Sequence, residues 1–209
     1  MSNDKLLASL FNKYDCDKAA KHLYHTVYAP ELEKYKDAEI NFLEVGVFKG
    51  ASLRAWLDFF PNATFYGIDV FTRVDPKDID VLKNPRVKWI KADSTKLAVI
   101  STIKEQWPGV AFDVIIDDGP HTPRANADTF GNLVPFLKDT GVYFIEDVWP
   151  IDIMSQKDMK NAWVQNHSKD LNILEMNYFL NKVKGYTFER FDLRLVTNQP
   201  DSHIIKITK

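Results

Sequence analysis

Short apolar runs alternate with longer amphipathic segments over the central part of the chain. The apolar runs have strand length and occupy residues 40–47, 64–70, 87–93, 112–118 and 141–147. Between several of them lie segments in which apolar residues recur at helical spacing, over residues 51–60, 95–107 and 124–137. Strands separated by helices are typical of βαβ units. The pattern therefore predicts an α/β protein with a largely parallel, doubly wound, Rossmann-like sheet.

The end of the chain departs from this alternation. Residues 186–195 and 202–209 are two further strand-like runs, and only the hexapeptide VTNQPD joins them. A connection this short favours an antiparallel hairpin. The whole pattern thus predicts a seven-stranded sheet that is mostly parallel and ends in a C-terminal antiparallel hairpin.

Composition and charge narrow the class of protein. Hydrophobic residues make up 45% of the chain and charged residues 27%, with a net charge of −2, which is typical of a globular domain and argues against a nucleic-acid-binding surface. The single Cys16 excludes an internal disulfide and a cysteine-rich metal site. The first residues lack the pattern of a signal peptide and no apolar run reaches membrane-spanning length, so we expect a cytoplasmic protein.

The carboxyl ends of the first three strands carry acids and glycines. Ligands of open α/β sheets bind at these ends. The first strand ends in Glu44-Val-Gly46 with Gly50 shortly after, and glycines allow a ligand to approach the backbone closely. The spacing is not that of a dinucleotide fingerprint, and the acid before Gly46 suits a cationic or hydroxyl-rich ligand better than a diphosphate. A glycine-containing turn of this kind is also common without any ligand.

Two further acids end the second and third strands. Asp69 stands where a carboxylate accepts hydrogen bonds from ribose hydroxyls, and Asp93 stands where one accepts from an exocyclic amine such as that of adenine. Each acid alone also fits a helix cap or a solvated loop. Three acids at successive strand ends favour a nucleoside-containing ligand.

These residues resemble the cofactor signature of class I S-adenosylmethionine-dependent methyltransferases. The resemblance extends from about residue 40 to residue 209 and includes the C-terminal hairpin. It implies that Gly46 and Gly50 flank the methionine moiety, that Asp69 binds the ribose and that Asp93 lies near the adenine. S-adenosylmethionine is then the cofactor and S-adenosylhomocysteine the product.

A narrower resemblance lies upstream, in the segment DKAAKHLYHTVY at residues 17–28. This segment is similar to the one that precedes the first strand in antibiotic-sugar O-methyltransferases of the macrocin and mycinamicin type, where it helps to close the cofactor pocket. The resemblance implies that Asp17, Lys18, His22 and Tyr24 line the pocket. The alternative is a surface helix whose His22, Tyr24 and Tyr28 pack on the sheet.

The same narrower resemblance implies a metal and proton-transfer site. Its D-G-S-H motif corresponds to Asp118-Gly119-Pro120-His121, and its later E-D pair corresponds to Glu146-Asp147. In a methyltransferase sheet the fourth and fifth strands are neighbours, so these acids converge and repel one another unless a cation or bound protons compensate their charge, and a divalent cation is the simplest compensation. Mg²⁺ suits such oxygen ligands, which makes Asp118, Glu146 and Asp147 the expected metal ligands.

Histidine 121 is the expected general base, because an imidazole titrates near neutral pH. The alternative for His121 is a solvated loop residue or a helix cap. Pro120 replaces the family's serine and removes a hydroxyl and a backbone donor. Asp117 either orients the loop or contacts the amino group of the cofactor, and Asp147 either binds the metal or caps the following segment.

The chain is expected to form one methyltransferase domain with four parts. These are a helical cap at 1–38, a cofactor-binding core at 40–147, an acceptor-side insertion at 148–185 and the hairpin at 186–209. Candidate acceptor-pocket or lid residues in the insertion are Trp149, Trp163, His167, Met176, Tyr178 and Phe179.

The predicted function is O-methylation, dependent on S-adenosylmethionine and Mg²⁺, of a small hydroxylated molecule such as a sugar or glycosylated metabolite. One alternative is methylation of another acceptor, either a nitrogen or a nucleic acid. The other is a catalytically inactive cofactor-binding partner protein. A homodimer is compatible with the sequence, whereas a membrane or nucleic-acid partner is not expected.

Overall fold

The computed structural model describes residues 1–209 and contains one seven-stranded sheet with the strand order β3-β2-β1-β4-β5-β7-β6. The strands are β1 (Asn41–Val45), β2 (Thr64–Asp69), β3 (Val87–Lys91), β4 (Phe112–Asp117), β5 (Leu137–Ile145), β6 (Thr187–Asp192) and β7 (His203–Thr208). The first five strands pair in parallel, and β7 is antiparallel to both β5 and β6. The predicted fold class is therefore confirmed.

The connection between β6 and β7 is longer than the sequence suggested. We expected a strand as far as Leu195, but β6 ends at Asp192 and α9 (Arg194–Thr197) follows. Leu195 and Val196 are 97% and 73% exposed, so the apolar pattern that suggested a strand has no packing surface here. The Asp192 carboxylate accepts hydrogen bonds from the Arg194 backbone and guanidinium, which favours a turn at this point.

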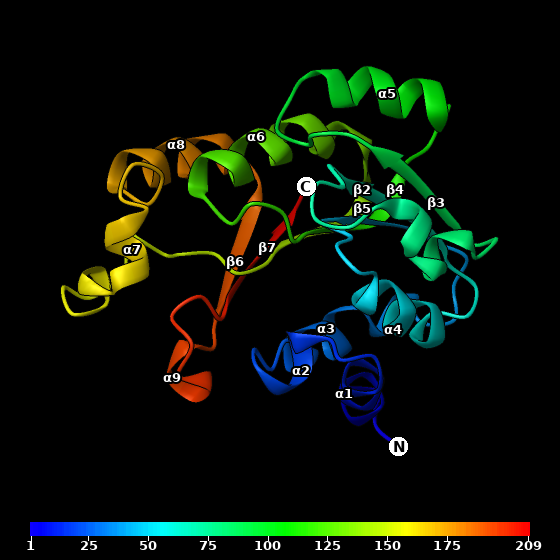
Figure 1. Cartoon of the computed structure of the whole chain (residues 1–209), viewed down its shortest axis with the longest axis horizontal. Coiled ribbons are helices and arrows are strands. Elements are labelled where there is room, and N and C mark those ends of the chain that lie inside the picture. Colours follow the sequence, from blue (N-terminus) through cyan, green and yellow to red (C-terminus); the bar gives the residue numbers. More distant parts are fainter.

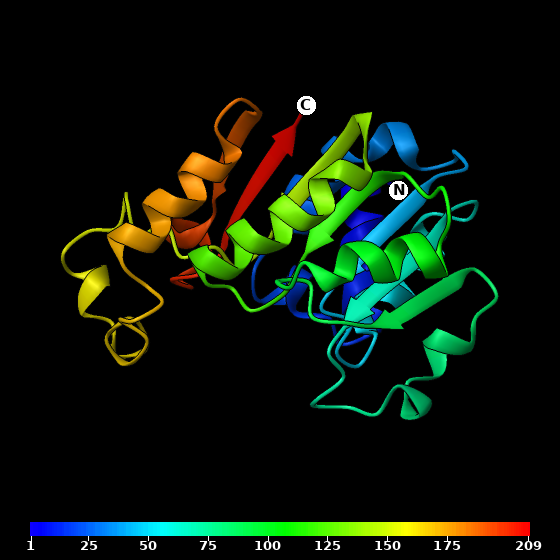
Figure 2. The ribbon, with the colours of Figure 1, turned by 90° about the horizontal axis from the view of Figure 1, so that it is seen from above.

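Helices cover both faces of the sheet, as Figures 1 and 2 show. One face carries α1 (Asn3–Lys13), α2 (Asp17–Ala20), α3 (His25–Glu31) and α4 (Ala51–Phe59), with a 3₁₀ turn at Glu33–Tyr35. The other face carries α5 (Ala98–Gln106), α6 (Pro123–Leu133) and α8 (Ile173–Val183). The short α7 (Ala162–Asn166) lies beyond the end of α8, and further 3₁₀ turns occupy 76–78, 80–83, 134–136 and 158–160.

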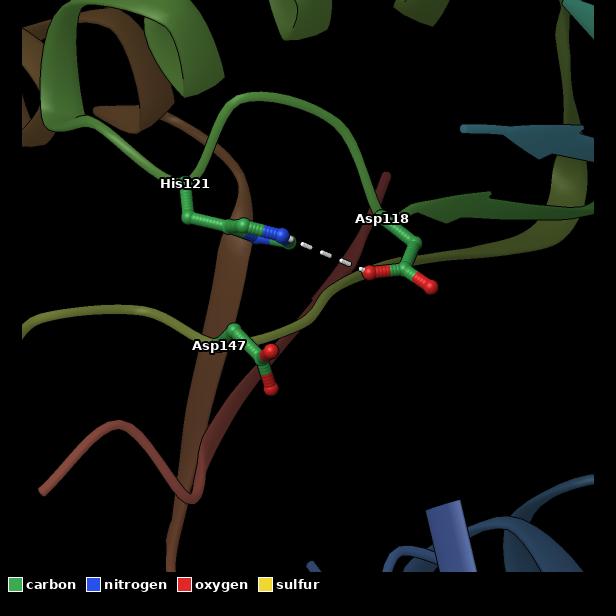
Figure 3. A group of neighbouring side chains, drawn as sticks. All are labelled: Asp118, His121 and Asp147. Carbon is green, nitrogen blue, oxygen red and sulfur yellow. Dashed lines mark ion pairs between the residues drawn. The ribbon is translucent and has the colours of Figure 1, made fainter. Parts of the chain in front are cut away.

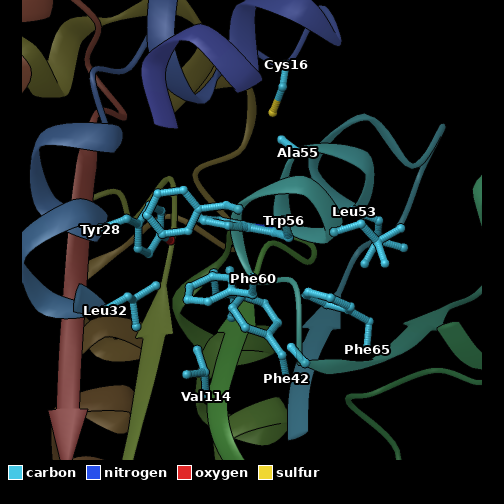
Figure 4. Close-up of a cluster of buried hydrophobic side chains, with 14 of the residues drawn as sticks. Cys16, Tyr28, Leu32, Phe42, Leu53, Ala55, Trp56, Phe60, Phe65 and Val114 are labelled. Atoms are coloured by element: carbon cyan, nitrogen blue, oxygen red, sulfur yellow. The ribbon is translucent and has the colours of Figure 1, made fainter. Parts of the chain in front are cut away.

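An aromatic cluster joins the N-terminal helices to the sheet (Figure 4). Trp56 of α4 is fully buried, and its ring centroid lies 4.9 Å from that of Phe11, 5.3 Å from that of Tyr28 and 5.3 Å from that of Phe42. These rings come from α1, α3 and β1, so one indole links three elements. Edge-to-face and tilted contacts of this kind add to the stability that burial of the rings provides.

The strand register places the predicted site residues along one edge of the sheet. Val45 of β1 is level with Ile68 of β2 and with Asp117 of β4, and Asp117 is in turn level with Ile145 of β5. The residues that immediately follow these strands therefore emerge together. This edge is the carboxyl end of the parallel strands, where ligands of such sheets bind.

Replacing Trp56 by alanine is expected to lower the free energy of unfolding by about 3–5 kcal/mol, because the large cavity cannot be filled by its neighbours. Urea denaturation followed by circular dichroism measures this. The control is Leu97→Ala at a side chain that is 77% exposed, which should change stability by less than about 0.5 kcal/mol. Similar losses in both variants would mean that the aromatic cluster does not organise this face.

Candidate active site

A cavity of about 590 Å³ opens at the carboxyl edge of the sheet. Of the residues predicted from the sequence, those that line it are Asp17, Gly46, Asp69, Asp93, Asp118, His121, Glu146 and Asp147. Glu44, Gly50, Asp117, Lys18, His22 and Tyr24 are not among its lining residues. Except for Glu44 and Asp117, the strand-end acids thus share one cavity. Of the residues predicted from the N-terminal segment, only Asp17 lines it.

Two glycines shape the turn after β1. Gly46 has a φ of +87°, and a Cβ atom there would lie 2.0 Å from the carbonyl oxygen of Asp118. Gly50 has a φ of +72° and begins α4, and a Cβ atom there would lie 2.4 Å from Val81. A side chain at either position would displace neighbouring groups. The glycines therefore allow the β1 turn and the β4 loop to approach each other closely.

Asp69 and Asp93 both hold the loops around the cavity. Asp69 accepts backbone hydrogen bonds from Phe48 at 2.9 Å and from Phe71 at 2.6 Å, one on each oxygen. Asp93 Oδ1 accepts from the backbone and the hydroxyl of Thr95. Because each carboxylate oxygen has two lone pairs, these acids retain acceptor capacity toward the cavity.

Glu44 and Asp117 are fully buried acids. Neither carboxylate oxygen of Glu44 has a hydrogen-bond partner, and burial raises the pKa of Glu44 to about 7. Asp117 Oδ1 accepts from the Gly119 backbone at 3.2 Å, and burial raises the pKa of Asp117 to about 7 as well. The contact with Gly119 supports the role of Asp117 in orienting the loop.

Lys18 lies between two of the predicted metal ligands. Its Nζ donates to Asp118 Oδ2 at 2.6 Å and to Glu146 Oε2 at 2.5 Å, and the side chain is 2% exposed. Burial by itself would lower the pKa of Lys18, but the charges of Asp118 and Glu146 outweigh it and hold the pKa well above its usual value. Lys18 is therefore a buried ammonium that pairs the ends of β4 and β5.

Other side chains of the N-terminal segment also contact these acids. The Tyr28 hydroxyl donates to Glu146 Oε1 at 2.5 Å, and the Tyr24 hydroxyl donates to Asp147 Oδ1 at 2.6 Å. His22 is buried, with its Nδ1 2.8 Å from the Ser202 hydroxyl. Tyr28 was considered from the sequence only as a packing residue. Its hydroxyl could not be assigned to Glu146 because 118 positions separate the two residues.

Asp118, His121 and Asp147 form the group that faces the cavity (Figure 3). Each offers one potential ligand atom, and these atoms lie within 4.8 Å of one another. His121 Nε2 is 3.7 Å from Asp118 Oδ1, beyond hydrogen-bond distance, and Nδ1 has no hydrogen-bond partner. Two carboxylates and an untethered imidazole can hold a divalent cation and can also accept a proton from a bound hydroxyl.

Four residues that line this cavity have left-handed backbone conformations although none is glycine. They are Phe48, Phe71, His121 and Asp147, with φ between 47° and 56°. Such conformations are strained for residues with a Cβ atom and persist where the surrounding structure enforces them, often at functional sites. In this protein they set the direction in which the chain continues after β1, β2, β4 and β5.

The sequence profile of a family described as a methyltransferase domain matches residues 43–148, just over half of the chain. The chain belongs to this family. The matched residues run from β1 to just beyond β5 and so include every strand end that borders the cavity. The family predicted from the sequence is confirmed.

Curated relatives of the chain are named as O-methyltransferases. One of them, 28% identical over 155 residues, is 8-demethyl-8-alpha-L-rhamnosyl tetracenomycin-C 2'-O-methyltransferase from Streptomyces olivaceus, an alignment that covers 69% of this chain and 39% of that protein. The chain is 30% identical over 151 residues to mycinamicin VI 2''-O-methyltransferase from Micromonospora griseorubida, an alignment that covers 68% of this chain and 36% of that protein. It is 27% identical over 135 residues to demethylmacrocin O-methyltransferase from Streptomyces fradiae, with 61% and 32% covered. The chain thus spans about a third of the length of these curated relatives.

Solved structures support the fold of the chain. MycE methyltransferase from the mycinamycin biosynthetic pathway, in complex with Mg and SAH, superposes with a TM-score of 0.69 at 22% identity, covering 97% of this chain and 54% of that one. A putative caffeoyl-CoA O-methyltransferase from Staphylococcus aureus superposes with a TM-score of 0.64 at 16% identity, covering 88% and 82%.

Among the helices of this chain, none combines the length and apolarity that crossing a membrane requires.

A second cavity of about 250 Å³ adjoins the first, and His121 and Trp163 line both. Trp163 stacks on Trp149 with centroids 4.8 Å apart and on His167 with centroids 3.9 Å apart. Trp149 also lines the second cavity, whereas Met176 and Phe179 are buried in the core and the Tyr178 hydroxyl donates to Asp128. The insertion therefore contributes its tryptophans, and not α8, to the cavity walls.

Stability is expected to fall as the pH rises from about 4.5 to about 7, because the unfolded chain ionises Glu44 in this range while the folded protein keeps it protonated. Below that range both states hold the proton, and above it both have lost it. Glu44→Gln should remove this contribution. The free energy of unfolding of the variant minus that of wild type should therefore rise by roughly 3 kcal/mol between pH 4 and pH 8. Urea denaturation across this pH range measures the difference, and parallel curves for both proteins would contradict it.

Proposed function

We propose that this protein is a cytoplasmic S-adenosylmethionine-dependent O-methyltransferase that uses Mg²⁺ and acts on a hydroxyl of a small molecule, such as a sugar or glycosylated metabolite. The observation that carries the proposal is the group of Asp118, His121 and Asp147, which faces a cavity bordered by Gly46, Asp69 and Asp93. The names of the relatives in Micromonospora and Streptomyces support O-methylation of a sugar. The structures of MycE with Mg and SAH support the choice of cofactors.

The cofactor is proposed to occupy the part of the cavity beside β1, β2 and β3. Gly46 leaves the backbone open to close approach, and the oxygens of Asp69 and Asp93 retain acceptor capacity for the ribose hydroxyls and the adenine amine. S-adenosylmethionine supplies a methyl group on a positively charged sulfur.

Methyl transfer forms a bond between the acceptor oxygen and the methyl carbon while the carbon–sulfur bond breaks, and the hydroxyl proton must leave. His121 is proposed to take that proton, because its ring lies at the junction of the two cavities and its nitrogens are not tied by hydrogen bonds. Asp118 Oδ1, 3.7 Å from Nε2, would stabilise the imidazolium that results. S-adenosylhomocysteine and the methyl ether are the products.

The carboxylates of Asp118 and Asp147 are proposed to hold the metal. Mg²⁺ prefers oxygen ligands and keeps several waters, so these two acids are sufficient protein ligands and His121 stays free as the base. Bound there, Mg²⁺ would act as a Lewis acid that lowers the pKa of an acceptor hydroxyl. Glu146, the third ligand expected from the sequence, already accepts hydrogen bonds on both oxygens.

The acceptor is proposed to enter through the second cavity. Its wall combines the stacked rings of Trp149 and Trp163 with the polar side chains of Asn161, Gln199 and Asp201. A sugar ring carries C–H groups and hydroxyls on the same small frame, so a wall of indole rings with amide and carboxylate groups complements it. The Asp201 carboxylate borders this cavity, and its Oδ1 is buried without a hydrogen-bond partner in the protein.

S-adenosylhomocysteine is expected to bind with a dissociation constant on the order of micromolar in isothermal titration calorimetry. Gly46→Ala should abolish this binding, because its Cβ atom clashes with Asp118 at a strained φ. Gly131→Ala is the matched control, since a Cβ atom there meets no neighbour within 4 Å. Absence of binding to the wild-type protein would refute the proposed cofactor.

His121→Ala should lower the methylation rate by about 10²–10⁴-fold while S-adenosylhomocysteine still binds, because only the proton acceptor is lost. EDTA should abolish activity and added Mg²⁺ should restore it. The assay measures release of S-adenosylhomocysteine with a panel of glycosides, and His25→Ala is the control histidine outside both cavities. Full activity of His121→Ala in the presence of EDTA would refute both the base and the metal.

A further inference from the structure

Only two residues line both cavities, His121 and Trp163. They come from distant parts of the chain, since His121 follows β4 and Trp163 belongs to α7 in the insertion after β5. An acceptor hydroxyl that gives its proton to His121 while it meets the methyl group of the cofactor must lie where the two cavities join. Such a hydroxyl therefore lies beside Trp163 as well as beside His121.

Both faces of the Trp163 indole are covered by other rings. Trp149 stacks on it with an interplanar angle of 7° and centroids 4.8 Å apart, and His167 stacks on it with an angle of 20° and centroids 3.9 Å apart. Trp149 and His167 make no ring contact with each other, so they lie on opposite faces of the indole. Although Trp163 is 41% exposed, a ligand in either cavity therefore meets the edge of its indole.

This column of three rings is fixed from both ends. Trp149 is 4% exposed and belongs to the hydrophobic core, as does Val164, the neighbour of Trp163 in α7. At the other end His167 Nδ1 donates to the Trp163 carbonyl oxygen at 2.8 Å, which holds the imidazole over the indole. Asn161 Oδ1 accepts from the Trp163 backbone at 2.9 Å. The indole is thus held in place before an acceptor binds, which reduces the entropy lost on binding.

The edge of an indole suits a hydroxylated ligand. The quadrupole of an aromatic ring gives its edge partial positive charge and its faces partial negative charge. The edge of Trp163 therefore favours the oxygen atoms of an acceptor, as do the side-chain amides of Asn161 and Gln199 in the second cavity. A large apolar group would gain more from an indole face, but it would first have to displace His167 from Trp163.

We infer that Trp163 is a specificity-determining residue of the proposed O-methylation and that His167 is the positioning residue that holds it. The edge of the Trp163 indole borders the junction of the cavities together with His121, so it selects which acceptor hydroxyl reaches the base. This role rests on the proposed function and adds to it a determinant in the insertion after β5. Acceptor binding then depends on the stacked rings, whereas cofactor binding at the ends of β1, β2 and β3 does not.

Steady-state kinetics with the substrate that wild type methylates best, among a panel of neutral methyl glycosides, test Trp163. Trp163→Ala should raise KM for this glycoside by roughly tenfold and leave the dissociation constant of S-adenosylhomocysteine within about threefold of wild type, because only the wall of the junction is lost. Trp163→Phe keeps a smaller ring and should have an intermediate KM. The control is Leu174→Ala, at a side chain that is 76% exposed in the same insertion and lines neither cavity.

The same assay tests whether His167 acts by stacking. His167→Ala should raise KM for the glycoside about fivefold, because the uncovered indole turns more freely, and His167→Phe should bring KM back to within about twofold of wild type. A merely structural loss would not be rescued by phenylalanine. A lower KM in His167→Ala would mean that acceptors stack on the freed face of Trp163, and this would overturn the contact with its edge.

Acrylamide quenching of tryptophan fluorescence measures the cover over Trp163 without any acceptor. His167→Ala should increase the quenching when Trp163 is present and leave it unchanged in the Trp163→Phe background. An equal increase in both backgrounds would show that His167 does not shield Trp163, which would refute its positioning role.

The outcomes also separate this role from the proposed function. Failure of wild type to methylate any glycoside of the panel, with normal binding of S-adenosylhomocysteine, would refute the proposed class of acceptor and with it the role of Trp163. Methylation by wild type together with an unchanged KM in Trp163→Ala would refute only the role of Trp163.

Discussion

The pairing of the buried Lys18 ammonium with carboxylates from two strands is the interaction on which the site depends. The parallel sheet brings Asp118 and Glu146 together at one edge, and their repulsion in a buried setting would oppose folding. Lys18 relieves it from a helix that precedes the sheet by more than twenty residues. The helical segment before β1 is therefore part of the site, although the family profile begins only at residue 43.

The hydrophobic core and the site are continuous through Tyr28. Its ring packs against Trp56 and Phe144, and its hydroxyl donates to Glu146. The same residue thus anchors α3 on the sheet and holds one acid in place. In the same way, the hydroxyl of the buried Tyr24 donates to Asp147. Side chains fixed by packing hold polar groups more accurately than loops alone can, which suits a site in which a metal and a base must stand side by side.

The strand ends of the common fold and the insertion after β5 supply different walls of the two cavities. The ends of β1, β2 and β3 supply a turn open to close approach and acids with free acceptor capacity, while the insertion after β5 supplies the stacked tryptophans. His121 stands where the two cavities meet. Its left-handed backbone conformation, shared with Asp147 across the cavity, is enforced by the surrounding loops and places both side chains toward the same space.

The sequence by itself determined the strands, their class of sheet and the acids at their ends, because hydrophobic period and strand-terminal residues are local properties. Asp69, Asp93, Asp118 and His121, which the sequence singled out, line the cavity. The short helix after β6 and the burial of Glu44 were not readable in the pattern, since Leu195 and Glu44 take their environment from distant elements. Only the tertiary structure decided which of the acids pair with the Lys18 ammonium. Lys18 and Glu146 are 128 positions apart in the chain, and no local pattern of residues encodes a contact between positions so far apart in the sequence.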